Sequence, residues 1–162
     1  MAELNEGDES HSHDYLHMSL FVILALKEFV KEYVTTMGHE IIDLGPDSAD
    51  RVDYPDFAKK CAEAVIADKG SFGILICGTG IGISIAANKV PGIRAALCHD
   101  TYTAKLTRQH NDANILCFGE RVVGKGVIED MIVAFASTEF EGGRHAGRVA
   151  KIEGCSLGAD LG

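Results

Sequence analysis

Apolar positions recur along the chain at two spacings, one typical of helices and the other of buried strands. From Leu26 to Met37 they repeat every three or four residues, and Gly38 follows where a helix would end. The run Phe72–Cys77 has the composition of a parallel strand covered on both faces. The predicted strands are 40–44, 72–77, 93–98 and 115–118. The predicted helices are 26–37, one opened by Asp53–Asp56, 83–89, 101–110, 127–135 and 143–151.

Strands and helices alternate with short turns, which predicts crossover connections and therefore a parallel sheet. We expect an α/β fold, a three-layer α/β/α sandwich on a sheet of about five strands, with the first strand altered or missing. A chain of 162 residues suits one such domain. Residues 15–152 are assigned to that domain, 1–14 to a disordered acidic tail and 153–162 to a flexible C-terminal tail.

Charge and hydropathy exclude several classes of partner. Lys and Arg number 15 against 24 Asp and Glu, a net charge of −9, so the chain repels phosphate backbones and anionic lipids on average. Nucleic acid and membrane are therefore not expected partners. The longest apolar run, Leu20–Leu26, has 7 residues, whereas a membrane-spanning helix needs roughly 20. An anionic small molecule would need a local basic pocket.

The cysteine pattern indicates a reducing compartment. The chain has five cysteines, an odd number, with no Cys-x-x-Cys pair, and most lie in apolar runs. We expect reduced thiols and a cytoplasmic location. The five are Cys61, Cys77, Cys98, Cys117 and Cys155.

A glycine-rich turn follows the apolar strand, in the sequence Cys77-Gly-Thr-Gly-Ile-Gly82. Ligands of open parallel sheets bind at the carboxyl ends of strands, where this turn would lie. Glycines let backbone N–H groups converge on an anion, and the same field favours a cysteine thiolate, so the turn could supply a base and an oxyanion site. Glycines that merely make the turn, with Cys77 ending a buried strand, explain the pattern equally well. The turn lacks the residues of a Walker loop and the spacing of GxGxxG, which disfavours a nucleotide.

Two polar segments follow. His110, in the segment Arg108–Asn114, could carry a proton, or it could cap a helix. In the segment Glu141–Arg148, two arginines are four residues apart and share a helical face, so they could bind a phosphate or could simply be solvated.

Five motifs are distributed over the chain in a fixed order. They are Asp53–Phe57, Ile74–Gly82, Ser84–Ala96, Arg108–Asn114 and Glu141–His145. In this order they strongly resemble the ribose-5-phosphate isomerase B family. The resemblance extends from Leu24 to Lys151, 128 of the 162 residues.

The resemblance implies a Rossmann-like fold and an aldose–ketose isomerase of the pentose phosphate pathway. The enzyme would interconvert ribose 5-phosphate and ribulose 5-phosphate through an enediolate, with no metal or organic cofactor. It implies Cys77 as the catalytic base, His110 as the residue that assists ring opening, and Thr79 as a residue that helps activate the thiol. The substrate-binding residues it implies are Tyr54, Gly78, Gly80, Ile81, Gly82, Asn111, Arg121, Arg144 and Arg148. It also implies a homodimer, or a tetramer, in which some arginines reach the site across the subunit interface.

The chain departs from the family at its first strand. Leu20 and Phe21 stand where the family has an Asp-His pair of the substrate pocket. Either 15–19 or 20–24 could form that strand, but the apolar spacing favours a helix that begins at about Ser19. The resemblance also leaves open a hexose-6-phosphate isomerase acting on galactose or allose 6-phosphate, and the departure at Leu20 and Phe21 leaves open a non-enzymatic dimer.

Overall fold

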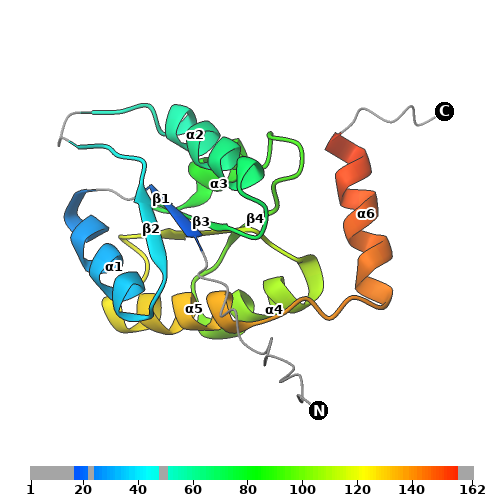
Figure 1. The fold of residues 1–162 in the computed structure, drawn as a ribbon. Coiled ribbons are helices and arrows are strands. Elements are labelled where there is room, and N and C mark those ends of the chain that lie inside the picture. The colour runs from blue at the N-terminus through cyan, green and yellow to red at the C-terminus, as the bar shows by residue number, and fades with distance from the viewer. Residues whose placement is uncertain (1–16, 22–23, 48–50, 157–162) are drawn as a thin grey trace, which may run out of the picture.

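The fold is built on a parallel sheet. The computed structural model describes residues 17–21, 24–47 and 51–156 (Figure 1). Its strands are β1 (His17–Phe21), β2 (Glu40–Asp43), β3 (Phe72–Cys77), β4 (Ala95–Leu97) and β5 (Ile115–Gly119). They pair in the order β2-β1-β3-β5-β4, and every pairing is parallel. The α/β class and the parallel sheet predicted from the sequence are confirmed.

Helices cover both faces of the sheet. They are α1 (Leu24–Thr36), α2 (Tyr54–Ala67), α3 (Ile81–Ala87), α4 (Thr101–Asn111), α5 (Lys125–Ser137) and α6 (Arg144–Ser156). Figure 1 shows α2 and α3 above the sheet and α1, α4 and α5 below it, whereas α6 stands to one side. None of these described helices is both long enough and apolar enough to cross a membrane.

The core consists of two clusters separated by the sheet, and β3 contributes to both. Phe72, Ile74 and Ile76 pack with α1, α4 and α5, while Leu75 packs with α2 and α3. This alternation follows from the two-residue period of a strand. The run 72–77 is apolar because helices cover both of its faces, as the sequence predicts.

The first strand corrects the expectation of a helix from Ser19. Residues 17–21 form β1, which pairs with β2 on one side and β3 on the other, and α1 begins only at Leu24. The apolar spacing was ambiguous because a strand buried in the centre of a sheet and a buried helix can share it. Pairing decides in favour of the strand, since an empty place there would leave the backbone groups of β2 and β3 without partners.

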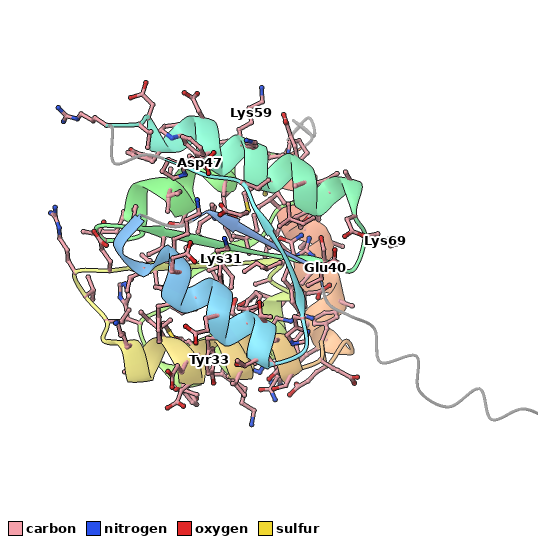
Figure 2. All side chains as sticks on the ribbon, turned by 60° about the vertical axis from the view of Figure 1, so that its left-hand side comes forward. Lys31, Tyr33, Glu40, Asp47, Lys59 and Lys69 are labelled. Carbon is pink, nitrogen blue, oxygen red and sulfur yellow. The ribbon has the colours of Figure 1, made fainter. Side chains whose placement is uncertain are left out.

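The edge strand β2 is tied to α1 through charges. The buried amine of Lys27 lies 2.9 Å from an oxygen of Asp43, and it donates to the carbonyl of Pro46 at 2.8 Å. Lys31, labelled in Figure 2, lies 3.3 Å from the same carboxylate. Burial alone would raise the pKa of Asp43, but hydrogen bonds from Lys27, the Gly45 amide and Lys31 together hold it below its ordinary value.

Other boundaries differ by a few residues. The helix predicted to end at 151 continues to Ser156, and the strand predicted over 93–98 is confined to Ala95–Leu97. The flexible tail predicted over 153–162 is wrong for its first four residues, because 153–156 belong to α6. The rest of that tail, 157–162, and the predicted tail 1–14 lie outside the described residues.

Gly73 is required by close packing, and this can be tested. A Cβ at this position would lie 2.8 Å from Cys61 Sγ and 2.9 Å from Ile115. We expect Gly73→Ala to lower the free energy of unfolding by about 1–3 kcal/mol in urea titrations, because the core would be overpacked. Gly126→Ala is the matched control: nothing lies within 4 Å of its added Cβ, and α5 should tolerate or slightly favour alanine. Equal losses in both variants would contradict this account.

Candidate active site

Cys77 ends β3 and opens the glycine-rich turn at the carboxyl edge of the sheet. Its side chain is partly exposed, and its Sγ accepts a hydrogen bond from the Gly80 amide at 3.1 Å. The Thr79 hydroxyl accepts one from the Ile81 amide at 3.3 Å. The turn therefore places a backbone N–H donor against the sulfur of Cys77.

Glycines allow the turn to lie directly against the end of β5. Gly80 has a φ of 80°, and its Cβ would lie 2.7 Å from the Phe118 carbonyl carbon. A Cβ on Gly119 would lie 2.6 Å from the Thr79 backbone. Two backbone hydrogen bonds reinforce this contact, from Glu120 N to the Cys77 carbonyl at 2.9 Å and from Arg121 N to the Gly78 carbonyl at 3.1 Å.

Two predicted substrate-binding side chains border this turn. Tyr54, the first residue of α2, lies so close to Gly82 that a Cβ there would be 2.6 Å from its ring. The guanidinium of Arg121 lies 3.7 Å from the corresponding position at Gly78. The structure therefore brings together a thiol, a donor-rich turn, an aromatic wall and a cation. Ile81, half exposed, begins α3 at the same place.

The other predicted residues form a second group around the end of α4 and the start of α6. His110 stacks on the buried His145, with ring centroids 4.3 Å apart and planes 13° apart. Asn111 ends α4 beside His110. Arg144 and Arg148 are exposed on the first turns of α6.

The two groups lie at opposite ends of the parallel strands. The group around Cys77 lies at their carboxyl ends, the carboxyl edge of the sheet, and the group around His110 lies at their amino ends, the amino edge. The starts of β3 and β5 are paired through Gly73 and Ile115, and their ends through Cys77 and Gly119. Helix α4 leaves the carboxyl end of β4 and returns to the start of β5, so His110 lies at the amino edge. A six-residue strand such as β3 spans about 17–20 Å, so one chain does not bring His110 to Cys77.

Cys77 is more exposed than the cysteines of the core. Burial raises the pKa of Cys61 to about 12 and also raises the pKa values of Cys98 and Cys117. These three therefore stay protonated and inert. Cys77 and Cys155 are the accessible thiols, and none of the five cysteines forms a disulfide bond.

His110, Glu141 and His145 place their ligand atoms within 4.8 Å of one another, close enough to consider a metal ion. A metal lies close to the plane of each imidazole that binds it. Because the two rings are stacked nearly in parallel, their nitrogens do not converge on a common point. The cluster as arranged is therefore a stacked pair with a carboxylate beside it, and His145 Nε2 lies 3.6 Å from Glu141.

Two residues that lie near the second group were not identified from the sequence. His145 lies within a recognised motif between two arginines, and that position was a usable signal. Arg94, also inside a motif, contacts Asn111, Asp112 and Glu153, but no spacing in the sequence indicates these contacts.

Comparisons with known proteins agree with this architecture. The family model described as Ribose/Galactose Isomerase matches residues 22–152. The chain is 49% identical over 127 residues to ribose-5-phosphate isomerase B of Escherichia coli, which covers 78% of this chain and 85% of the relative.

Solved structures extend the similarity to the fold. Ribose-5-phosphate isomerase B of Clostridium thermocellum superposes with a TM-score of 0.85 at 48% identity, covering 88% of this chain and 98% of that one. The enzyme of Mycoplasma genitalium with bound ribulose 5-phosphate has a TM-score of 0.84 at 39% identity, covering 89% of this chain and 98% of that one.

The pKa of His145, the buried member of the stacked pair, can be tested by titration. Burial lowers the pKa of His145 below its ordinary value, the nearby His110 lowers it further, and Glu141 raises it. We expect NMR titration to give a pKa below 6.5 for His145, and Glu141→Gln to lower it further. Since the folded pKa lies below the unfolded one, stability is retained above pH 6.5 and declines as the pH falls below it. A pKa that rises in Glu141→Gln would contradict this arrangement.

Proposed function

Because the chain belongs to the ribose/galactose isomerase family, we propose that it is an aldose–ketose isomerase that interconverts ribose 5-phosphate and ribulose 5-phosphate. The observation that carries the proposal is the accessible Cys77 thiol, whose Sγ accepts a hydrogen bond from Gly80 in a turn bordered by Tyr54 and Arg121. Proton transfer next to a carbonyl needs a base, donors for the developing oxyanion and little else.

In the proposed reaction, the Cys77 thiolate removes the proton from C2 of the open-chain aldose. The electrons of that C–H bond form the C1–C2 double bond of an enediolate, with negative charge on O1. The thiol then returns the proton to C1, while the hydroxyl proton of O2 moves to O1. No electron leaves the substrate, so the reaction requires no redox cofactor. In the proposed mechanism, hydrogen-bond donors of the protein, rather than a metal, stabilise the negative charge.

The glycine turn and its neighbours would stabilise the enediolate. Backbone amides of Gly78–Gly82 supply donors that are fixed before the charge develops, which is the basis of oxyanion stabilisation. Thr79 would help to hold the thiol, and Ile81 would lie beside the substrate. Arg121 is placed to attract the substrate anion to a chain whose net charge of −9 would otherwise repel it.

Phosphate binding and ring opening are assigned to the amino-edge group. Arg144 and Arg148, one helical turn apart, suit a phosphate, and His110 with Asn111 would assist opening of the furanose ring. Since these residues lie at the opposite edge from Cys77, we propose a homodimer in which each site combines Cys77 of one chain with the arginines of its partner. The five cysteines form no disulfide bond, which favours a cytoplasmic location.

The pentose is favoured over the alternatives. A relative 49% identical and solved structures 48% and 39% identical are all named ribose-5-phosphate isomerase B, whereas hexose isomerisation rests only on the breadth of the family. The non-enzymatic dimer rests on Leu20 and Phe21, where an Asp-His pair is expected. Turnover by the purified chain distinguishes these functions.

Activity should depend on Cys77. We expect the purified chain to convert ribose 5-phosphate to ribulose 5-phosphate, and Cys77→Ala to lower kcat by about 100- to 10,000-fold, since it removes the base. Cys155→Ala, which removes the other accessible thiol, should leave kcat unchanged. No turnover by the unmodified chain on this substrate would overturn the proposed function, and turnover that survives Cys77→Ala would overturn the assigned base.

The shared site predicts complementation between inactive variants. Cys77→Ala and Arg148→Ala should each be inactive alone. After they are mixed under conditions that exchange subunits, about half of the dimers are mixed, and each mixed dimer holds one intact site. We therefore expect recovery of about a quarter of the original activity in a coupled assay. No recovery, despite exchange shown by native mass spectrometry, would mean that each site is complete within one chain.

A further inference from the structure

Helix α6 carries the two arginines but packs weakly on its own chain. Of its side chains whose burial is described, only His145 is buried, and neither described core cluster includes a residue of α6. A cavity of about 620 Å³ lies between this helix and the sheet edge, lined by residues that include Leu97 of β4, Thr107 of α4 and Ile152 of α6. Hydrophobic packing within the described chain therefore does not fix where α6 lies.

Two side-chain contacts between described residues, one near each end of α6, connect this helix to α4 and to the segment that leads into β4. At its start, His145 stacks on His110. Two turns later, Glu153 pairs with Nη1 of Arg94. Contacts at two points along a helix determine both its direction and its rotation about its axis, and thus where Arg144 and Arg148 point.

Arg94 is itself held firmly. Its side chain is 17% exposed, and its Nε donates to the carbonyls of Asn111 at 3.1 Å and Asp112 at 2.9 Å. Its backbone amide donates to the Asn114 side chain at 2.8 Å. The Asp112 carboxylate lies 3.5 Å from Arg94 Nη2 and 2.9 Å from Arg108 Nη1. Arg94 therefore joins the start of β4, the end of α4 and the far part of α6.

We propose that Arg94 and Glu153 are positioning residues for phosphate recognition, because their ion pair holds α6 in the orientation that presents Arg144 and Arg148. The inference rests on the proposed function, since it takes these arginines as the phosphate ligands. In this proposal, Arg94 and Glu153 act through α6 and do not contact the substrate themselves. The same guanidinium also holds the turn that follows His110, so it sets the spacing between the residue that opens the ring and the residues that bind the phosphate.

The test compares two variants that remove one carboxylate each. Glu153→Ala breaks the pair with Arg94, and Glu63→Ala removes an exposed carboxylate on α2 that lies 3.7 Å from Lys59. Both make the chain less negative by one charge, which by long-range electrostatics alone would favour an anionic substrate. We expect Glu153→Ala to raise the KM for ribose 5-phosphate about fivefold with kcat within twofold, and Glu63→Ala to change neither. Glu153→Gln, which keeps an acceptor oxygen, should recover part of the loss.

A second measurement does not depend on activity. Hydrogen exchange of the amides of 144–156 should be faster in Glu153→Ala than in the unmodified chain, while exchange in β3 and β5 stays the same. Unchanged exchange in α6, or an unchanged KM, would overturn the positioning role. If the unmodified chain turned over no sugar phosphate, the proposed function would fail instead. The positioning role would then be tested by hydrogen exchange and by the affinity for inorganic phosphate. Glu153→Ala should weaken that affinity, and an unchanged affinity would refute the positioning role.

Discussion

All described strands run in one direction, and the distribution of the chemistry follows from that constraint. In a parallel sheet, every turn from strand to helix lies at one edge and every turn from helix to strand lies at the other. The turn after β3 therefore places Cys77 at the carboxyl edge, and the end of α4 places His110 at the amino edge. No choice of side chains removes this separation within one domain. The proposed homodimer follows from this separation, because a site that uses both residues would need a second molecule.

The shape of the carboxyl-edge site depends mainly on two glycines that have no side chain. Without side chains on Gly80 and Gly119, the backbone of the turn lies against the end of β5, and a Cβ at either position would come within 2.7 Å of backbone atoms. Close contact between two backbones fixes the directions of the N–H groups around Cys77 more firmly than flexible side chains could. Preorganised donors of this kind lower the free energy needed to develop negative charge on the substrate.

The sequence predicted the elements that depend on local patterns and failed where pairing decides. The strand 72–77 was predicted to the residue, because helices cover both of its faces and its apolar run has clear limits. The turn at Gly38 was predicted from the glycine itself, and the reason is physical: the turn requires a φ of 84°, which glycine adopts without strain. Residues 17–21 were misjudged, since their apolar pattern fits a helix and a strand equally. The choice was made by β2 and β3, which lie far along the chain.

The candidate site shows the same division. Cys77 and its glycines were recognisable because they are contiguous in sequence. The role of Arg94 was not, because its partners Asn111 and Glu153 lie 17 and 59 residues away, and the ion pair exists only once three elements have assembled. Contacts between distant segments leave no periodic signal in a single sequence.

The first strand has a consequence for how such a sheet can change over evolutionary time. The family model begins at residue 22, just after β1, yet solved relatives superpose on 88% and 89% of the chain. Since β1 is the described neighbour that connects β2 to β3, its place must be filled, but backbone pairing asks little of the sequence that fills it. The place of β1, between β2 and β3, is therefore a position where one segment can replace another without loss of the architecture. Catalytic groups carried on such a segment can be exchanged while the fold is kept.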